Sequence, residues 1–439
     1  MIKNVHFFNL KNNLFENIGY RCFQIGVLCL PSSAVISYIF LLVALVEGTW
    51  TRRDLYWKEY WNYPLLGISF LMLVGCIYSQ TGWLSWIGLF NWLPFFWCFW
   101  GLQPYLSNSE KRIKCSALLV LGSLPVLITG FGQLWLGWEG PWQLFDGLII
   151  WFVAPGGEPL GRLSGLFDYA NITAAWLSAI WPFSFAFVLH PFIFGKNRVI
   201  PFALLILFIL AMILTDSRNA WGAIFLGLPL VFGPSSWSWL IPLILIFLLP
   251  VFFAITPSFD FGIQQFARNI VPESIWMRLN DMQFVDTRPF EATRVGQWTV
   301  AIKLIFEKPL FGWGAAAFSI IYPLRTTLSK DYWNLGHSHN LPLELAISHG
   351  ILVSIFLNLF VFSLLISSAY FRIFNKLNSK KVLIIDRAWW TSILILICFH
   401  ATDIPSFDSR INILGWILLI GLRCMISKPK IDHLALKQV

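Results

Sequence analysis

Apolar residues occur along this chain in long blocks separated by short polar segments, and this pattern predicts a bundle of membrane-spanning helices. The blocks approach the roughly 20 residues that an α-helix needs to cross a bilayer core of about 30 Å. A membrane β-barrel would instead show short segments of alternating polarity. After a first apolar block at residues 20–48, we expect spans at residues 63–78, 83–101, 115–135, 171–190, 199–215, 220–233, 237–255, 342–367, 388–404 and 411–426.

The first block is interrupted at Pro31-Ser32-Ser33, which favours two short helices over one long helix. The fold class is therefore all-α, a polytopic transmembrane bundle of about twelve spans. The first apolar stretch runs on into Val43 and Leu45 without a small-residue cleavage pattern, so we expect it to remain as an anchor and not to be a cleaved signal peptide.

Basic residues mark the side on which each connection lies, because cytoplasmic loops of membrane proteins carry an excess of Lys and Arg. An even number of proposed spans separates every pair of basic loops. We therefore expect both termini in the cytoplasm of a bacterial cell and the chain in its inner membrane. The basic positions are Lys3, Lys11, Arg21, Arg52, Arg53, Lys58, Lys111, Arg112, Lys114, Lys196, Arg198, Arg372, Lys376, Lys380, Lys381, Arg387, Lys428 and Lys430.

The remaining connections face outward, to the periplasm, and the longest covers residues 256–341. Loops of this length are usually functional or disordered. Helical spacing of Trp298, Ala301, Ile302 and Ile305 predicts an amphipathic helix within it, lying on the membrane surface or capping the bundle. The chain thus divides into about nine N-terminal spans at 1–255, a periplasmic loop at 256–341, and about three spans with a cytoplasmic tail at 342–439.

Composition excludes a soluble globular protein for most of the chain. Of 439 residues, 57% are hydrophobic and only 12% are charged, with 24 Trp and 41 Phe. The net charge of +9 would favour nucleic acid as a partner of a soluble protein, but here the positive charge lies in loops beside apolar spans. Membrane lipids are the expected partner instead. The seven cysteines have no metal-ligand spacing and are interpreted as small helix residues.

Three polar groups are expected on the same outer face. The first is the turn from Thr215 to Arg218, the second is Arg294 at the start of the amphipathic helix, and the third is the run from His337 to Asn340. Arginine so close to apolar spans often lines a functional cavity, although Arg218 could simply pair with Asp216. A histidine near neutral pKa is a candidate base; its alternative is an ordinary hydrogen-bonded loop residue.

Further candidates lie near these groups. Glu344 could be a partner of His339 or a satisfied interfacial acid, and Arg162 with Asn171 could be a site element or part of a plain turn. His400 and Asp403 are three residues apart near another outward helix end and could share a face, so they rank second.

The order of several short motifs resembles the O-antigen ligase and polymerase superfamily over roughly residues 150–365. The motifs are Gly161-Arg162-Leu163-Ser164-Gly165 with Asn171, Ser217-Arg218, Arg294 with Pro309-Leu310-Phe311-Gly312-Trp313-Gly314, and His339-Asn340. The resemblance implies a membrane glycosyltransferase that works on the periplasmic face without metal or other cofactor. Its donor would be a polyprenyl-diphosphate-linked glycan and its acceptor a glycan or a lipid-linked molecule.

The resemblance also implies residue roles. Arg218 and Arg294 would bind the donor diphosphate, and His339 would activate the acceptor hydroxyl, with His337 as the alternative base. Two guanidinium groups suit a diphosphate whose negative charge grows as the glycosidic bond breaks. One departure weakens the match, because Ser348-His349 stands before Gly350 where members of the family often carry an acidic residue.

Two other functions remain open from the sequence. The same outward arginines could attract a small anion such as bicarbonate in a transporter, although neither an inverted repeat nor paired broken helices are clear. In a non-catalytic envelope scaffold, Arg218, Arg294 and His339 would be structural, and changing them would leave surface polysaccharide intact.

Overall fold

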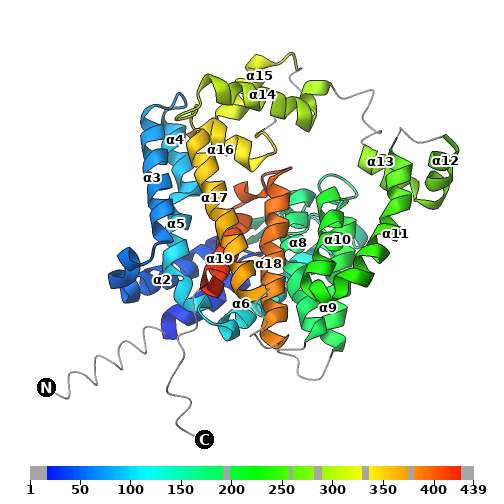
Figure 1. The fold of residues 1–439 in the computed structure, drawn as a ribbon, viewed down its shortest axis with the longest axis horizontal. Coiled ribbons are helices and arrows are strands. Elements are labelled where there is room, and N and C mark those ends of the chain that lie inside the picture. Colours follow the sequence, from blue (N-terminus) through cyan, green and yellow to red (C-terminus); the bar gives the residue numbers. More distant parts are fainter. Residues whose placement is uncertain are drawn as a thin grey trace, which may run out of the picture.

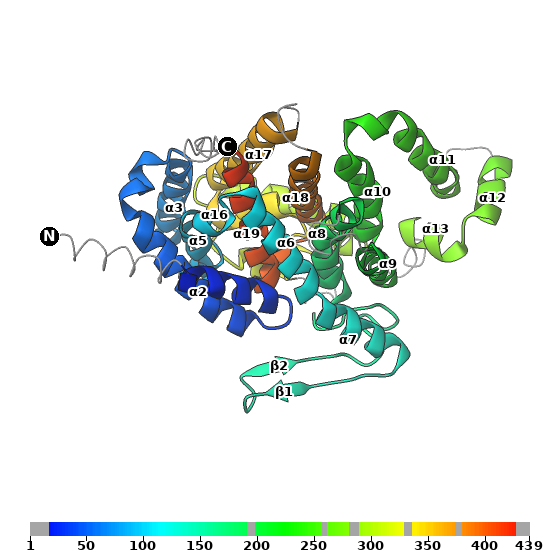
Figure 2. The same cartoon turned by 90° about the horizontal axis from the view of Figure 1, so that it is seen from below.

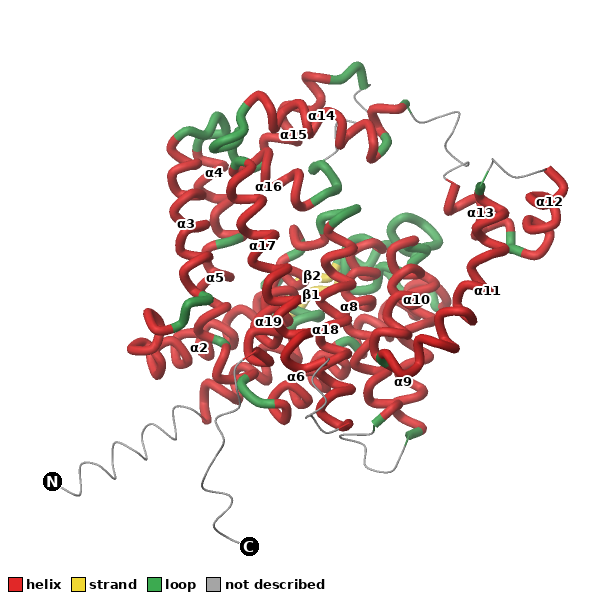
Figure 3. The backbone as a smooth tube through the Cα atoms, viewed as in Figure 1, coloured by secondary structure: helices red, strands yellow, loops and turns green. Residues whose placement is uncertain are grey.

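The computed structural model describes residues 17–190, 198–256, 261–280, 289–328, 336–373 and 380–426, and most of these residues are helical (Figures 1 and 3). Lys3, Lys11, Lys196, Lys376, Lys428 and Lys430, on which part of the topology prediction rests, lie outside these ranges. A helix over residues 17–29 and α2 (Ala34–Arg52) confirm the predicted break in the first block. The Ser33 side chain caps α2 by accepting the N–H of Ile36 at 3.3 Å.

The α-helices that follow α2 extend along the whole described chain. They are α3 (Asn62–Ile77), α4 (Trp83–Gly88), α5 (Leu93–Gly101), α6 (Ser109–Gly122), α7 (Leu124–Trp135), α8 (Ala170–Leu189), α9 (Val199–Leu214), α10 (Arg218–Phe232), α11 (Trp237–Ile255), α12 (Phe261–Ile270), α13 (Glu273–Asn280), α14 (Arg294–Glu307), α15 (Ala317–Arg325), α16 (Leu341–His349), α17 (Ile351–Ser368), α18 (Lys380–His400) and α19 (Ser409–Ile426).

Seven helical segments among the described residues are long and apolar enough to cross a membrane. Three shorter apolar helices, α3, α9 and α10, accompany them. The chain is therefore a multi-pass membrane protein, although its helices are less uniform than the twelve similar spans expected from the sequence.

Three expected spans are each divided between two helices, and one of them, 115–135, is divided between α6 and α7 at Ser123. The segment at 83–101 forms α4 and α5 with a 3₁₀ turn between them, and the segment at 342–367 forms α16 and α17, which are separated at Gly350. Gly350 has a φ of 90°, in the left-handed region, and the N–H of Ile351 bonds the Pro309 carbonyl at 2.8 Å. The break lets the segment after α14 enter between the two helices.

Helix α8 lies at the centre of the bundle. It packs against α18, α9 and α10, and Trp176 and Trp181 are fully buried. Ala174, Ala175 and Ala179 are small enough to let neighbouring backbones approach closely. In contrast, α11 is mostly exposed and extends with α12 and α13 away from the other helices (Figures 1 and 2).

A short β-hairpin, not expected from the sequence, follows α7. Strands β1 (Trp142–Leu144) and β2 (Ile149–Trp151) pair antiparallel, and the hairpin projects beside α7 (Figure 2). Trp151 donates a hydrogen bond from its indole to the Ser32 carbonyl. This contact places the hairpin on the same side of the bundle as the turn before α2, in agreement with the predicted topology.

The predicted amphipathic helix exists as α14. Thr293 caps it by accepting the N–H of Gly296 at 3.2 Å, and α14 packs against α15 and α16 at the top of Figure 1. Of the four apolar positions, Ala301 and Ile305 are buried, whereas Ile302 is 46% exposed. The buried face also carries Leu304 and the polar side chain of Gln297.

The basic segments expected inside the cell meet at one end of the bundle. Arg112 on α6 forms a buried ion pair with Asp386 on α18 at 3.0 Å. Arg423 near the end of α19 pairs with Glu59, and Arg52 donates to Gln103 at 3.2 Å. Arg387 donates to the Phe232 carbonyl at 2.8 Å. The segments predicted to face outward meet at the opposite end.

Candidate functional site

The candidate site is formed where five segments meet. They are the loop between β2 and α8, the turn between α9 and α10, the start of α14, the His337–Asn340 loop before α16, and the loop between α18 and α19. The candidate residues lie on these segments or, for Asn171, Glu344 and His400, on the helices that adjoin them. Hydrogen bonds or ion pairs connect the segments to one another.

The histidine loop is held by its own polar groups. Asn340 caps α16 by accepting the N–H of Leu343 at 3.0 Å, and Asn340 also donates to the Ala401 carbonyl at 2.9 Å. The buried Glu344 carboxylate accepts the N–H of Ser338 at 2.9 Å, while the Trp298 indole donates to the Ser338 carbonyl at 3.0 Å. Glu344 and Asn340 therefore fix the loop that carries both histidines.

His339 has an unusual backbone and a defined ring orientation. Its φ of 53° lies in the left-handed region, which non-glycine residues seldom occupy. The Nδ1 atom lies 2.7 Å from Oε1 of the fully buried Gln297, whose amide nitrogen donates to the Ala292 carbonyl at 3.3 Å. A carbonyl oxygen can only accept, so the neutral ring carries its proton on Nδ1, and Nε2 is the atom able to accept a proton.

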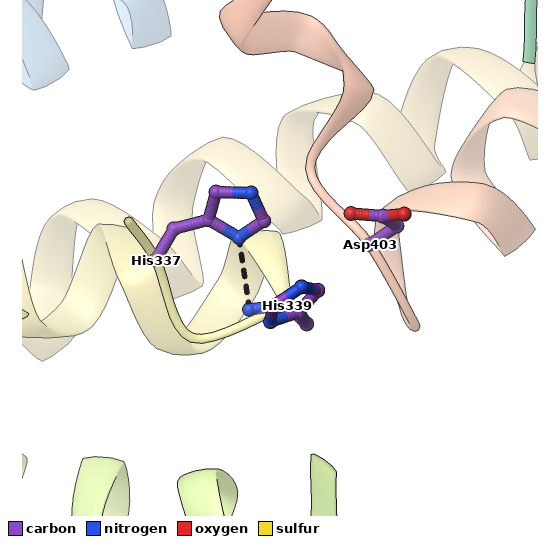
Figure 4. A group of neighbouring side chains, drawn as sticks. All are labelled: His337, His339 and Asp403. Atoms are coloured by element: carbon purple, nitrogen blue, oxygen red, sulfur yellow. Dashed lines mark hydrogen bonds between the residues drawn. The ribbon is translucent and has the colours of Figure 1, made fainter. Parts of the chain in front are cut away.

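His337 holds the opposite tautomer. Its Nδ1 accepts the backbone N–H of His339 at 3.2 Å, so the proton of the neutral ring is on Nε2 (Figure 4). Burial lowers the pKa of His337 below its ordinary 6.5, an effect that the positive charge of Arg294 reinforces and the negative charge of Asp403 opposes. His337 is thus a neutral residue that supports the loop from beside His339.

Asp403 connects the histidines to the arginine groups. Its carboxylate lies 3.8 Å from an Arg294 guanidinium nitrogen and accepts from the Asn171 amide at 3.4 Å. Figure 4 shows the same carboxylate beside the rings of His337 and His339. The expectation that His400 and Asp403 share a helix face was wrong. Helix α18 ends at His400, whose Nδ1 bonds the Leu396 carbonyl at 2.6 Å, whereas Asp403 lies in the following loop.

Arg162 is part of this network and not of a plain turn. Its side chain is buried, and it donates to the Thr215 carbonyl at 2.8 Å and to Asn171 Oδ1 at 2.7 Å. Because Asn171 also donates to Asp403, the guanidinium of Arg162 is linked through a single amide to the carboxylate beside the histidines. Arg162 and Asn171 therefore position each other at the site.

Arg218 begins α10 after Ser217, on the same turn. Asp216, its proposed partner, forms an ion pair with Arg278 on α13 at 3.1 Å. The next residue, Asn219, donates to the Thr402 hydroxyl at 2.8 Å. Thr215, on the same turn as Arg218, thus bonds Arg162, and Asn219 connects this turn to the loop that carries Asp403.

One group of described residues could hold a metal ion. His337, His339 and Asp403 each offer a ligand atom, and these atoms lie within 4.8 Å of one another. However, the Nδ1 atoms of both rings make hydrogen bonds, and the carboxylate faces the guanidinium of Arg294. A fixed positive charge at that distance opposes binding of a cation.

Sequence reasoning missed several of these partners. Gln297 is a neutral residue on a helix, and only its place on the buried face could have singled it out. The ion pair of Arg278 with Asp216 and the contact of Asn219 with Thr402 join distant segments, for which the sequence carries no local signal. Asp403 had a weak signal, an acid next to the end of an apolar span.

Comparison with known protein families gives a match. Residues 202–358 match the family model described as O-antigen ligase. The matched region begins in α9, ends in α17, and contains Arg218, Arg294, His337 and His339, whereas Arg162, Asn171 and Asp403 lie outside it. The chain has no match among curated proteins.

Proposed function

The match of residues 202–358 identifies this chain as a membrane glycosyltransferase of the O-antigen ligase family, and on this premise we propose that it transfers a glycan from a polyprenyl-diphosphate carrier to an acceptor hydroxyl. The transfer occurs at the periplasmic face of the bacterial inner membrane and needs no metal. The observation that supports this proposal is the network that joins Arg162, Arg294 and both histidines through Asp403.

His339 is the general base in this mechanism. Its Nε2 takes the proton of the acceptor hydroxyl while the hydroxyl oxygen attacks the anomeric carbon of the donor glycan. The hydrogen bond from Nδ1–H to Gln297 holds the required tautomer and stabilises the imidazolium that forms. His337 is a weaker candidate, because its Nδ1 already accepts the His339 N–H.

The arginines stabilise the leaving group. As the new glycosidic bond forms, the bond between the anomeric carbon and the diphosphate oxygen breaks, and its electron pair stays on the diphosphate. Arg218 and Arg294 bind this growing negative charge with charge-assisted hydrogen bonds. Attack opposite the leaving group inverts the anomeric configuration. Asp403 and Asn171 position Arg294 and Arg162 and do not touch the donor.

The test compares single variants in a strain that lacks the protein. Arg218→Ala, Arg294→Ala and His339→Ala should each abolish surface glycan and cause lipid-linked donor to accumulate, with membrane levels equal to wild type. Arg325→Ala is the matched control, because Arg325 pairs with Glu307 on the exposed surface of the same outer region. Surface glycan should be unchanged in that variant.

A different outcome would favour the transporter. If deletion of the protein leaves both the surface glycan and the lipid-linked donor unchanged but alters uptake of bicarbonate or another small anion, the proposed transferase is refuted.

A further inference from the structure

Helix α12 carries a narrow apolar stripe that the other described elements leave uncovered. The side chains of Ile263, Phe266 and Ile270 are 48%, 68% and 56% exposed. At 3.6 residues per turn these three positions fall within an arc of about 60° around the helix axis. Large apolar side chains grouped on one exposed face mark a contact with lipid or with another protein.

The remaining surface of α12 is divided between a buried sector and a polar one. Ala267, and Val271 just after the helix, are buried where α12 packs on α11. Gln265 and Asn269 are exposed on the other side of the apolar stripe. The stripe therefore lies between a sector that contacts protein and a sector that suits water. A helix whose exposed surface is apolar on one side and polar on the other is typical of the membrane–water interface.

Helix α12 is fixed at the end of a span that faces lipid. Of the residues of α11 only Leu240 and Ala254 are buried, so lipid must surround most of this apolar helix. Arg268 Nε donates to the Ala254 carbonyl at 3.1 Å, and the Gln264 amide donates to the Thr256 carbonyl at 3.1 Å. These carbonyls lie at the end of α11, where a helix leaves its last carbonyls unbonded. Helix α12 thus lies at the level at which the span leaves the hydrocarbon core.

A lipid surface fits the stripe better than a second copy of this chain. Lipid already surrounds the last turns of α11 beside α12, where Phe252 is 50% exposed. Both helices lie at the edge of the molecule, away from the other spans (Figures 1 and 2). A stable protein interface buries about 800 Å² on each partner, which is more than a stripe of three side chains can supply.

We infer that α12 lies in the headgroup layer of the membrane at the candidate-site end of the bundle. Its Ile263, Phe266 and Ile270 side chains enter the lipid chains, and Gln265 and Asn269 face water. This contact with the membrane surface goes beyond the proposed function and does not depend on it.

The position of α12 has a consequence for the arginine turn, because α13 follows α12 directly. Arg278 on α13 lies 3.1 Å from the Asp216 carboxylate and donates to the Asp216 carbonyl at 3.3 Å. Arg218 is two residues further along the same turn. A helix held in the headgroup layer therefore sets the depth of this turn in the membrane. That this depth matches the diphosphate of a lipid-linked donor rests on the proposed function, whereas the placement of α12 does not.

Nitroxide labels on single cysteines test the placement in the full-length protein. A variant without the seven native cysteines is reconstituted in nanodiscs of phosphatidylethanolamine and phosphatidylglycerol. Electron paramagnetic resonance then compares collisions of each label with oxygen, which concentrates in lipid, and with a water-soluble nickel chelate. Phe266→Cys should favour oxygen several-fold more than Asn269→Cys, the matched control on the same helix. Phe247→Cys on exposed α11 is the lipid reference, and Thr327→Cys, exposed after α15, is the water reference.

Each result decides the inference. A ratio near the lipid reference for Phe266→Cys, with a ratio near the water reference for Asn269→Cys, would support it. Water-like ratios at both positions would overturn it, and lipid-like ratios at both would place α12 inside the hydrocarbon core and overturn it too. Exclusion of both reagents from the Phe266→Cys label would show a protein contact instead, and disulfide-linked dimers of the unlabelled variant would identify a second copy.

The experiment also remains decisive if one variant fails to fold. Ile270→Cys lies on the same stripe and replaces Phe266→Cys if that variant does not reconstitute. No measurement requires glycan transfer, so a failure of the placement leaves the proposed function intact, and an inactive protein can still show where α12 lies.

Discussion

At the scale of single residues, the pair formed by His339 and Gln297 decides which ring nitrogen can act as a base. The Gln297 amide is oriented by its second hydrogen bond to Ala292, so its oxygen faces the imidazole. An acceptor in this place selects the Nδ1–H tautomer, as the carboxylate does in Ser-His-Asp enzymes. Gln297 would thus be a positioning residue that acts through His339.

Replacing Gln297 tests this role. Gln297→Leu should lower kcat about 100-fold, because the tautomer with the proton on Nδ1 is no longer favoured. Gln297→Glu keeps an acceptor oxygen and should retain more activity than Gln297→Leu. Its added negative charge favours the imidazolium of His339, so the fall of its rate on acidification should begin at a higher pH than in wild type. Thr299→Ala on the exposed side of the same helix is the control. Equal kinetics in Gln297→Leu and wild type would contradict the assignment.

The pH dependence distinguishes the two histidines. Protonation of His337 should impair transfer only below its ordinary pKa of 6.5, because burial keeps this ring neutral. At lower pH, protonation removes the Nδ1 lone pair that accepts the His339 N–H, and the rate should fall. The measurement is kcat/KM against pH for purified enzyme.

Asparagine variants complete this experiment. His337→Asn retains a side-chain oxygen that can accept the same N–H without titrating and should keep most of the activity. His339→Asn should lose about 100-fold at every pH. The reverse ranking would make His337 the base.

The sequence identified the candidate charged residues because such residues are conspicuous in a chain that is only 12% charged. It could not predict which of them meet, since the contact of Asn171 with Asp403 joins positions 232 residues apart. Nor could it foresee the pairing of Asp216 with Arg278, because an adjacent arginine, Arg218, offered a simpler local partner.

At the scale of elements, the break between α16 and α17 positions the histidine loop relative to the membrane span. A Cβ on Gly350 would overlap the Leu310 carbonyl, and a Cβ on Gly312 would press against the Ile347 carbonyl. Both glycines have positive φ, so the backbone conformation and the close approach each require glycine. The resulting contact locks the end of α14 and its following turn against α16.

Gly350→Ala should therefore destabilise the protein by at least about 2 kcal/mol, from left-handed strain plus steric overlap. Thermal unfolding in detergent would show this as a lower midpoint, with activity reduced through the displaced loop. Gly67→Ala is the control: its site on α3 is open and helical, so its midpoint should be unchanged or slightly higher. A wild-type midpoint for Gly350→Ala would disprove the requirement for glycine.

Hydrophobic periodicity predicted the helices well where one helix spans one apolar block, as in α8, α9 and α19. It failed where the backbone is interrupted for tertiary reasons, because Gly350 and the turn between α4 and α5 lie inside blocks that are apolar on both sides. The hairpin was missed for a related reason. Its strands are only three residues each, too short to show a periodic pattern.

At the scale of the whole molecule, the two ends of the bundle have opposite characters. At one end the ion pairs of Arg112 with Asp386 and of Arg423 with Glu59 join the basic segments. At the other end lie the loop His337–Asn340, the turn from Thr215 to Arg218, and helices α14 and α15 (Figure 1). From the excess of Lys and Arg we propose that the end with these ion pairs faces the cytoplasm and the opposite end the periplasm.

This orientation predicts the accessibility of single cysteines introduced into a variant without the seven native ones. Thr327→Cys, exposed after α15, should react with a membrane-impermeant maleimide in intact cells whose outer membrane has been made permeable. Asp54→Cys, exposed after α2, should react only after the inner membrane is lysed. Wild-type glycan transfer in both variants provides the folding control. The opposite labelling pattern would place the site in the cytoplasm, where a periplasmic acceptor could not reach His339, and would refute the proposed reaction together with the topology.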